Sequence, residues 1–283
     1  MSKKIICLSL LLFAFVSTAF AQFPDPYLND DTRPDGTKWL TYPPSTIGGD
    51  FANDFYFYQW GKTQRDGDTG EQALSDESTP LYQVFSEAMG IELSYTDTPE
   101  IIKLAEAATS DAHASNKAVK KLYQRRRPFA TFNEPSLKPE EDEAEANSFS
   151  YPSTHATNGW VFAMALCTIA PERTEFIMDR ARVYAINRVI CGHHWKSDID
   201  ASLMLAAGLF PAIVTTEGFQ QQLAKARQEY NAAKGGYATE ISSLPVTQPS
   251  ESSPTYNIQG QRVTGQPDTP QIYIRKGVKY VAK

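Results

Sequence analysis

Two short polar segments of this chain contain histidines next to hydroxyl, cationic or carboxylate side chains. The first segment runs from Pro152 to His155 (PSTH), and the second runs from Arg188 to Asp198 (RVICGHHWKSD). Imidazole changes charge near neutral pH and acts as a nucleophile, an acid or a base. Guanidinium groups bind anions through several N–H donors. The two segments therefore predict nucleophilic and acid–base chemistry on an anion.

Helices are expected to hold these segments in place. An apolar run from Trp160 to Ala170 and an amphipathic run from Glu172 to Ile190 both have helical character. Ser153 and Thr154 fall at the start of the first helix, where free backbone N–H groups and the positive end of the helix dipole favour anions. A simple N-cap function for Ser153 is the alternative.

Arg188 lies on a broad, otherwise apolar stripe of the second helix that also includes Phe176, and such a cation is costly to bury unless it meets an anion. After the helix breaks, Ser197 to Asp200 resembles a capping box that opens the next helix. Asp198 follows His194 by four residues, so it is placed either to orient that imidazole or simply to complement the helix dipole.

A third cationic stretch precedes both segments. Residues 111–127 are predicted to form one long helix that ends before Pro128, because a proline disfavours the α conformation of the residue before it. Lys120 then lies two turns before Arg127 on the same helical face, so both cations point to one place. The neighbouring cations Lys121, Arg125 and Arg126 are expected on a solvated face.

The rest of the chain is expected to surround this site. The acidic segment from Glu134 to Asn147 is predicted to be a solvated connecting loop, with a lid over the site as the alternative. The remaining predictions are an irregular arm at 22–49, a helix at 50–62 capped by Asp50 or Asn53 and with core-packing aromatics, short helices at 81–88 and 99–108, a buried core helix at 201–216, and a polar helix at 219–234.

The first 21 residues have the pattern of a secretory signal peptide: two lysines, an uncharged apolar run and a small-residue cleavage site at Ala21. An anchored helix is the alternative. Cleavage reduces the 27 basic residues to 25 against 33 acidic ones, so the net charge changes from −6 to −8. Such an acidic chain disfavours nucleic acid as a partner. Cys167 and Cys191 then remain; two buried thiols are favoured over a disulfide, which the spacing leaves open.

The composition changes after the helical region. Residues 22–234 are predicted to form one helical domain, 235–255 a Ser/Pro-rich linker, and 256–283 a short β-rich tail. Two or three short strands are too few for an independently stable domain. The tail is also weakly similar to C-terminal segments of other exported bacterial proteins, which indicates surface sorting or attachment.

The three cationic and histidine-containing stretches together resemble a known family. Lys120 is followed after six residues by Arg127 and Pro128; PSTH comes next; then Arg188, His194 and Asp198 follow at spacings of six and four. This pattern resembles the three-part motif of the type 2 phosphatidic acid phosphatase (PAP2) superfamily, which also includes vanadium haloperoxidases. Within it, the RVICGHHWKSDID and FANDF stretches are most similar to secreted bacterial class A non-specific acid phosphatases, and the resemblance covers about residues 43–216.

The resemblance implies an all-α helical bundle that hydrolyses small phosphomonoesters without a metal or a cofactor. His194 is the expected nucleophile, Asp198 holds its ring, and His155 is the general acid and base. The phosphate-binding side chains implied by the motif are Lys120, Arg127, Ser153, Thr154 and Arg188. The chain departs from the family pattern at Thr154, where glycine is usual, and at Asn187, where serine is usual.

Alternative functions remain open at this level. A vanadium-dependent haloperoxidase would use the same pocket, with His194 as the vanadate ligand. A lipid phosphatase is disfavoured because no integral membrane span is expected after signal cleavage, and a non-catalytic phosphate-binding surface module would not need both histidines. The resemblance further implies an exported protein, periplasmic or at the cell surface, that forms a homo-oligomer, often a dimer.

Overall fold

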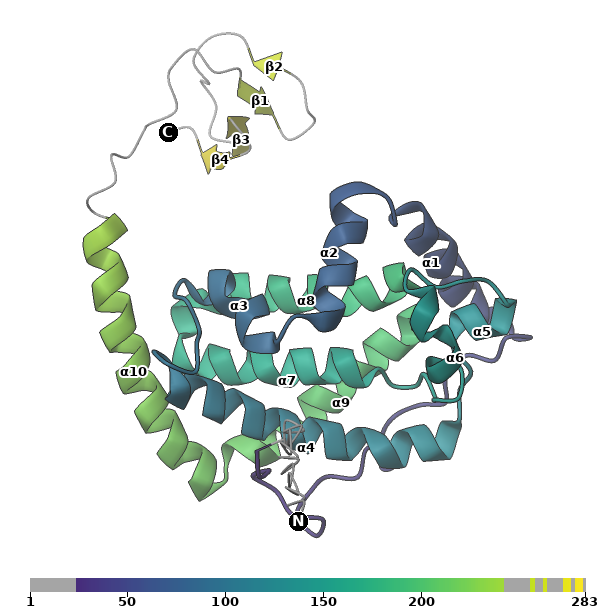
Figure 1. Cartoon of the computed structure of the whole chain (residues 1–283), viewed down its shortest axis with the longest axis horizontal. Helices are drawn as coiled ribbons and strands as arrows, with labels where there is room; N and C mark the ends of the chain where they lie inside the picture. The colour runs from purple at the N-terminus through teal and green to yellow at the C-terminus, as the bar shows by residue number, and fades with distance from the viewer. Residues whose placement is uncertain (1–23, 242–254, 258–261, 264–271, 276–277, 282–283) are drawn as a thin grey trace, which may run out of the picture. The chain divides into compact units, whose positions relative to one another are not determined.

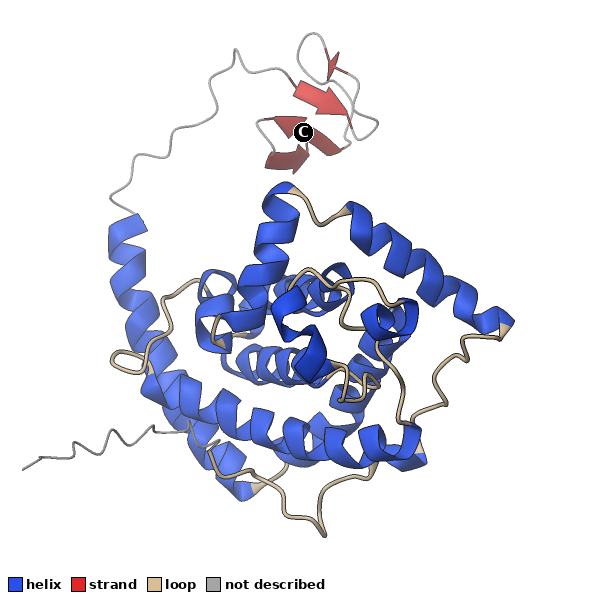
Figure 2. Cartoon of the chain, turned by 45° about the vertical axis from the view of Figure 1, so that its right-hand side comes forward, coloured by secondary structure: helices blue, strands red, loops and turns tan. Residues whose placement is uncertain are grey.

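A computed structural model of the chain describes residues 24–241 and four short stretches, 255–257, 262–263, 272–275 and 278–281 (Figure 1). The predicted signal peptide and most of the predicted linker lie outside the described residues. The chain divides into two compact units at Lys234 and Gly235, and each is described by itself. Within residues 24–234 every regular element is a helix, as predicted for an all-α domain (Figure 2).

Helix α7 (Thr154–Ile169) is the central element of the first unit. It packs against α4 (Pro99–Tyr123), α8 (Thr174–Cys191) and α9 (Lys196–Val214), which surround it in Figure 1. A helix that is apolar on all sides is stable only when neighbours cover it. Its buried side chains include Val161, Phe162, Ala163, Ala165 and Leu166, none of which is exposed.

The helices predicted at 81–88, 160–170 and 172–190 are confirmed as α3 (Leu81–Met89), α7 and α8, with a short 3-10 turn, η4 (Pro171–Arg173), between the last two. The stripe predicted on α8 is wrong at Phe176, whose side chain is 54% exposed beside the Arg173 guanidinium. The polar helix is α10 (Glu217–Ile241), which extends past the predicted end at 234.

The long helix predicted at 111–127 is wrong at both ends. The separate short helix expected at 99–108 is the first part of α4, which begins with Pro99 at its N-terminus and continues to Tyr123. Gln124 then adopts the left-handed conformation (φ 46°), and Arg127 is extended before α5 (Pro128–Phe132). Arg127 therefore does not share a helical face with Lys120. The proline restricts only the residue before it, and the left-handed C-cap ends the helix earlier.

The N-terminal arm is irregular from residue 24 to 48 apart from one 3-10 turn, η1 (Gly36–Lys38), as predicted. The backbone N–H of Leu28 donates to Asp111 on α4, which attaches the arm to the unit. After a second 3-10 turn, η2 (Gly49–Phe51), α1 (Ala52–Thr63) begins at an N-cap of Phe51 without a side-chain cap, so the predicted caps Asp50 and Asn53 are wrong.

The aromatic side chains of this region divide between core and surface. Phe51 and Tyr58 are buried against Trp195, as expected for core packing, whereas Phe55 is 45% exposed. The following helix, α2 (Gly67–Ser78), was not predicted because its sequence contains few apolar residues.

Helix α9 has one buried and one exposed face. Leu205, Leu209 and Ile213 are fully buried in the core, as predicted for a core helix, while Leu203 and Met204 are exposed. Among the described residues α9 is the one helix long and apolar enough to cross a membrane by length and composition, and 44% of its most apolar window is buried.

The acidic segment between α5 and α7 contains a 3-10 turn, η3 (Pro139–Glu141), and the short helix α6 (Asp142–Glu145). Every residue of α6 is at least partly exposed. The segment is nevertheless attached at both sides: Leu137 N–H donates to the carbonyl of Cys191, and Ser150 N–H donates to the carbonyl of Arg125. It is therefore an ordered connection with a solvated middle.

The second unit contains four short antiparallel strands in the order β2-β1-β3-β4. They are β1 (Thr255–Asn257), β2 (Arg262–Val263), β3 (Ile272–Arg275) and β4 (Val278–Val281). In the register of the sheet, Tyr256 of β1 pairs with Ile274 of β3, and Tyr273 of β3 pairs with Tyr280 of β4.

One close packing contact in the core gives a stability prediction. Gly159 of α7 faces the ring of Tyr184 on α8, and a Cβ at Gly159 would lie 2.5 Å from the ring atom Cδ1. Alanine is favoured over glycine in a helix by about 1 kcal/mol, but overpacking costs about 1–3 kcal/mol. Because the ring cannot move freely in the core, we expect Gly159→Ala to lower the free energy of unfolding by about 1 kcal/mol in urea titrations.

The control is Gly49→Ala, because a Cβ there meets no heavy atom within 4 Å. Tyr184 stacks on His155 with ring centroids 4.1 Å apart, so Gly159→Ala is also expected to lower any activity that depends on that imidazole. A more stable Gly159→Ala variant would contradict this packing.

Candidate active site

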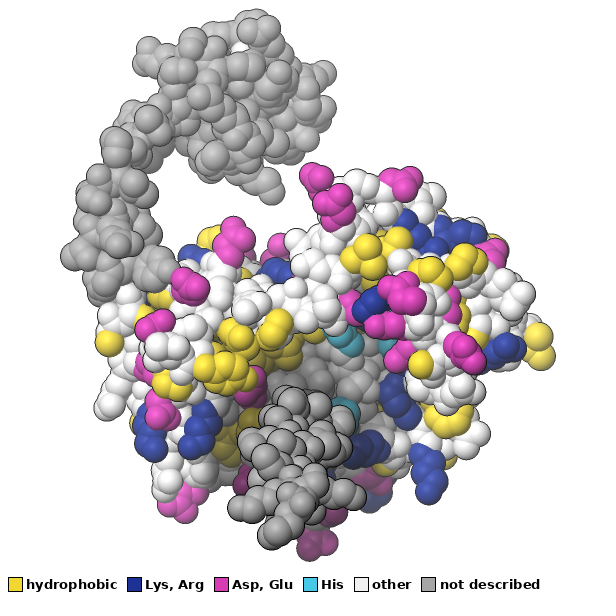
Figure 3. Space-filling view, in the orientation of Figure 1, with side chains coloured by type: hydrophobic (Ala, Val, Ile, Leu, Met, Phe, Trp, Pro, Cys, Tyr) yellow, Lys and Arg dark blue, Asp and Glu magenta, His cyan; other side chains and the backbone are white. Residues whose placement is uncertain are grey.

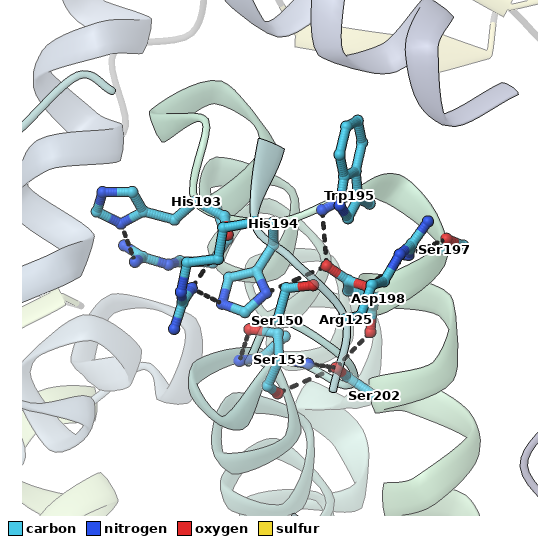
Figure 4. A network of polar contacts seen from close by, with 12 residues as sticks. Arg125, Ser150, Ser153, His193, His194, Trp195, Ser197, Asp198 and Ser202 are labelled. Atoms are coloured by element: carbon cyan, nitrogen blue, oxygen red, sulfur yellow. Dashed lines mark hydrogen bonds and ion pairs between the residues drawn. The ribbon is translucent and has the colours of Figure 1, made fainter. Parts of the chain in front are cut away.

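The three sequence stretches singled out above converge on one partly hollowed face of the helical unit. Figure 4 shows His194 close to Asp198 and Ser153, with Arg125 behind the carboxylate. In the space-filling view, histidine side chains are visible inside the hollow, with Lys and Arg side chains beside it (Figure 3). The residues come from the ends of α4, α7, α8 and α9 and from the connections between helices.

His194 follows the C-terminus of α8, where Gly192 adopts φ 85° and lets the chain leave the helix. Its ring is 3% exposed, with Nε2 3.0 Å from Nη1 of Arg127 and Nδ1 3.4 Å from Oδ2 of Asp198. A guanidinium only donates, so Nε2 accepts and the ring proton lies on Nδ1, toward the carboxylate. The lone pair of Nε2 is thereby directed into the cationic side of the site.

Asp198 occupies the first turn of α9, where it has two functions at once. Its Oδ2 accepts from the N–H of Trp195, the N-cap of α9, at 2.8 Å, which makes Trp195 rather than Ser197 the start of the predicted capping arrangement. The same oxygen faces His194. The position of Asp198 is therefore compatible with both predictions from the sequence, namely that it orients the imidazole of His194 and that it complements the dipole of the helix.

Arg125 was expected on a solvated face, and this is wrong. Its side chain is buried, with Nη1 2.6 Å from Asp198 and Nη2 2.6 Å from Asp54 of α1. Asp54 also accepts from the backbone N–H and the hydroxyl of Ser197. Lys121 and Arg126 are exposed as predicted. Leaving α4 at Gln124 turns Arg125 inward, which a continuous helix would not have done.

Arg127 is buried among acceptors from three directions. Its Nη1 donates to the carbonyl of His193 at 3.0 Å, its Nη2 donates to Ser148 at 2.7 Å, and Nη2 also lies 2.5 Å from Oε2 of Glu145 on α6. Glu145 is therefore a carboxylate bound to a cation of the site.

Lys120 lies in the last turn of α4, and its Nζ donates to the carbonyl of Phe149 at 2.5 Å. Burial and the nearby positive charge of Arg127 lower the pKa of Lys120 to about 7. Lys120 and Arg127 thus do reach a common region, although they are not on one helical stripe.

Arg188 is held by a carboxylate that was not predicted to be part of the site. Glu77 of α2 lies 2.9 Å from Nη1 and 3.0 Å from Nη2 of this guanidinium. Nη2 also lies 2.7 Å from Nδ1 of His193. Because arginine donates, His193 accepts at Nδ1 and carries its proton on Nε2, 3.8 Å from Asp142 of α6.

His155 lies in the first turn of α7 and stacks on Tyr184, whose hydroxyl is 3.3 Å from Nδ1. Burial, followed by the positive charge of Arg188, holds the pKa of His155 well below its usual range. Within the part of the chain that the structure describes, its Nε2 and the Nε of Arg188 are buried and form no hydrogen bond. These atoms are free to contact a bound group.

Ser153 is the N-cap of α7: its Oγ accepts from the N–H of Ala156 at 3.2 Å, and its own N–H donates to Ser202 at 3.0 Å. The N-cap interpretation of Ser153 is thus confirmed, with the residue placed beside the histidines. Thr154 follows as the first residue of the helix and is partly exposed. Asn187, buried behind the site, donates to Asp76 of α2.

The electrostatic setting suits a nucleophilic imidazole. Burial and the positive charges of Arg127, Lys120 and Arg188 hold the pKa of His194 well below its usual range. The ring therefore stays unprotonated in mildly acidic solution. A neutral imidazole facing several cations can attack an electrophile whose oxygens those cations hold.

Two other features of the site concern metals and thiols. Among the described residues no group of three or more His, Cys, Asp and Glu side chains is placed to hold a metal ion. Both Cys167 and Cys191 are free thiols, as favoured from the sequence; Cys191 is buried and Cys167 partly so. Burial raises the pKa of Cys191 to about 11, which keeps it protonated.

Sequence reasoning missed the carboxylates that hold the cations, namely the buried Asp54 and the partly exposed Glu77 and Glu145. The FANDF stretch pointed to Asp54, but not to its partner Arg125. Glu77 and Glu145 lie in polar stretches, where acidic residues are usually solvated, so only the folded chain distinguishes them from their neighbours.

Comparison with known proteins agrees with this geometry. A family model described as the PAP2 superfamily matches residues 101–221. The chain is 34% identical to a non-specific acid phosphatase of Providencia stuartii, across 78% of this chain and 95% of that protein. It is 30% identical to a non-specific acid phosphatase of Salmonella typhimurium, across 75% and 86%, and 26% identical to an acid phosphatase of Zymomonas mobilis, across 68% and 74%.

The Asp54–Arg125–Asp198 arrangement gives a prediction. Removing one partner of a buried ion pair leaves an uncompensated charge, so we expect Asp54→Asn to lower the free energy of unfolding by about 3 kcal/mol. We also expect kcat on an aryl phosphate to fall by about tenfold or more, because Arg125 then holds Asp198 less firmly. Urea titration and steady-state kinetics measure the two effects.

Asp50→Asn is the matched control, since it removes the same charge from an exposed position four residues earlier. Equal stability of the Asp54 and Asp50 variants would show that the buried pair is not a structural requirement.

Proposed function

This chain belongs to the PAP2 superfamily and is an acid phosphatase, and we propose that it hydrolyses small phosphomonoesters of broad range, without a metal, through a phosphohistidine intermediate. The observation that carries the proposal is the orientation of His194. Its Nε2 lone pair is directed to the Arg127 guanidinium, while its Nδ1 faces Asp198. An imidazole held in this tautomer is prepared to attack a phosphorus atom whose oxygens the cations bind.

In the first step Nε2 of His194 forms a bond to phosphorus as the ester P–O bond breaks. The ring becomes a cation, which the Asp198 carboxylate stabilises at Nδ1. Lys120, Arg127 and Arg188 hold the phosphoryl oxygens, together with donors at the start of α7 such as Ser153 and the Thr154 N–H. These cations take the part that a metal ion has in other phosphoryl-transfer sites.

His155 carries the proton in both steps. It gives a proton to the departing alkoxide, and then it removes one from the water that attacks phosphorus and releases His194. The low pKa of His155 means that the free enzyme holds this ring neutral. A phosphomonoester has a second pKa of about 6, so in mildly acidic solution the bound ester itself delivers the needed proton to the ring.

Activity in mildly acidic solution follows from opposite protonation requirements on His194 and Lys120. The nucleophile must be unprotonated, and the low pKa of His194 meets that requirement below neutrality. The cation Lys120 must be protonated, and with a pKa of about 7 it loses its charge as the solution becomes alkaline. The site is therefore fully charged for phosphate binding on the acid side of neutrality.

Export is part of the proposal. The signal-peptide pattern of residues 1–21 supports a protein that acts in the periplasm or at the cell surface. We expect no integral membrane span in the mature chain, and a homo-oligomer, a dimer. The strands beyond residue 254 are proposed to form a small β-rich appendage, joined to the helical domain by a Ser/Pro-rich linker that starts after the end of α10 at Ile241 rather than at residue 235.

The first test concerns the nucleophile. We expect His194→Ala to lose activity on an aryl phosphate by a factor on the order of 10⁶, as when the nucleophile of a covalent enzyme is removed. Chelator should leave the wild-type rate unchanged. His155→Ala should slow hydrolysis by about 10²–10⁴-fold for alkyl phosphates and less for aryl phosphates, because a better leaving group needs less proton transfer.

A phosphoenzyme that is labile to acid and stable to base should be trapped with wild-type enzyme and be missing from His194→Ala. Retained activity in His194→Ala, or loss with chelator, would disprove the mechanism. Halide oxidation by the vanadate-loaded protein without phosphate release from the aryl ester would favour a haloperoxidase instead.

The second test concerns pH. Because Lys120 binds phosphate only when protonated, we expect kcat/KM to fall as the pH rises through about 7. Lys120→Arg keeps the charge at all relevant pH values, so its profile should extend further to the alkaline side. The substrate loses its second proton at the same pH with both enzymes. Any difference between the two pH profiles of kcat/KM therefore reports the ionisation of Lys120. Superimposable profiles would refute this assignment.

A further inference from the structure

We propose that Glu145 determines the affinity of this site, because its carboxylate occupies Arg127 until a phosphate group displaces it. The proposal rests on the proposed function, since it concerns the same pocket. Oε2 of Glu145 lies 2.5 Å from Nη2 of Arg127. On the same guanidinium, Nη1 lies 3.0 Å from Nε2 of His194. A carboxylate is therefore bound to the cation nearest the nucleophilic nitrogen.

The position of Glu145 makes it displaceable. It ends α6, a four-residue helix in which every side chain is at least partly exposed, and its own side chain is 37% exposed. Moving it uncovers little apolar surface, so the cost of opening is small. Only the carboxylate needs to turn away, which also ends its hydrogen bond from the Ser148 hydroxyl. The hydrogen bond from Arg127 Nε to the carbonyl of Glu145, the one from Ser136 N–H to Asp142, and the backbone hydrogen bonds at Leu137 and Ser150 need not break.

Glu77 shows the contrast. It also binds a cation of the site, but its side chain is only 12% exposed and contacts both Arg188 and His193. Burial acts to raise the pKa of Glu77, but the Arg188 guanidinium outweighs it and holds this pKa well below its usual range, so Glu77 remains a carboxylate and keeps its contact with Arg188. Of the two, Glu145 is the one that substrate can replace, while Glu77 remains to position Arg188.

Charge balance favours this exchange. Lys120, Arg127 and Arg188 contribute three positive charges, which Glu77 and Glu145 partly neutralise in the free protein. A phosphate dianion that replaces Glu145 brings two negative charges in place of one. Together with Glu77 it neutralises the three positive charges. Keeping Glu145 on Arg127 beside the dianion would place like charges together in a poorly solvated site. Substrate binding and the Glu145–Arg127 contact are thus mutually exclusive.

A competing internal group raises the apparent dissociation constant of every ligand that needs Arg127. We expect Glu145→Gln to lower both KM for an aryl phosphate and Ki for inorganic phosphate by about two- to fivefold, the range for a partly exposed ion pair. kcat should stay within about twofold, because Glu145 is absent from the occupied site.

Glu143→Gln is the matched control. It removes the same charge from the same segment at an exposed residue, whose backbone carbonyl rather than its side chain accepts a hydrogen bond from Asn147. KM and Ki should change little in this variant. A general electrostatic effect of the acidic segment would instead lower both constants equally in the two variants and would overturn the proposal.

Hydrogen exchange gives a readout that is independent of turnover. Inorganic phosphate is expected to increase amide exchange in peptides covering residues 139–147 of the wild-type protein, because it removes the carboxylate contact that helps to hold α6 at Arg127. Glu145→Gln should exchange fast without phosphate. Protection of this segment by phosphate, or a higher KM and Ki in Glu145→Gln, would show that Glu145 supports Arg127 rather than competing for it.

The two proposals fail in different ways. Phosphate binding and release of α6 without any ester hydrolysis would refute the proposed reaction and leave the role of Glu145 intact. Normal hydrolysis with unchanged KM, Ki and exchange in Glu145→Gln would refute the role of Glu145 alone.

Discussion

The structure depends on burying four cations close to one imidazole. Arg125, Arg127 and Arg188 are each less than 9% exposed, and Lys120 is largely desolvated. A buried charge is tolerated only when partners and hydrogen bonds compensate for the lost water. Each guanidinium here has a carboxylate within 3 Å, supplied by a different part of the chain (Asp54 for Arg125, Glu145 for Arg127, Glu77 for Arg188).

The carboxylates and cations lie on different sides of His194, so that its imidazole remains reactive. Arg125 and Asp54 lie behind Asp198, whose carboxylate faces the side of His194 that carries the proton. Arg127 lies on the opposite side and faces the lone pair. A positive group on one side and a carboxylate on the other set the tautomer through ordinary donor and acceptor rules, without any strain in the ring.

The spacing of motifs was sufficient to predict the fold class and the segments that meet at the site. Apolar periodicity identified α7 and α8, and the PSTH segment was placed correctly at a helix start. The path between Lys120 and Arg127 was not predicted, because the left-handed residue that ends a helix is usually glycine and the glutamine at 124 gives no such signal. The alanine- and lysine-rich sequence also favours continuing the helix.

The carboxylates that hold the cations were also beyond sequence reasoning, for a physical reason. An acidic residue in a polar stretch such as Glu77 has the same local sequence environment whether it is solvated or buried against a cation. What differs is the tertiary position of α2, which depends on packing between distant elements. Pairings of this kind, 111 residues apart for Glu77 and Arg188, leave no local pattern.

All of the proposed catalytic side chains lie at helix ends, and the reason is geometric. Arg127 precedes α5, Ser153 caps α7, His194 follows α8, and Asp198 is in the first turn of α9. In this bundle, the middles of the helices present mainly apolar side chains to their neighbours, and the few buried polar groups there, such as Asp111, have their own partners. At the ends, free N–H groups and turns give buried polar side chains both partners and new directions. The charged site of this bundle therefore lies where several helix ends meet, and the large sequence separations between the motifs follow from the helix lengths that bring those ends together.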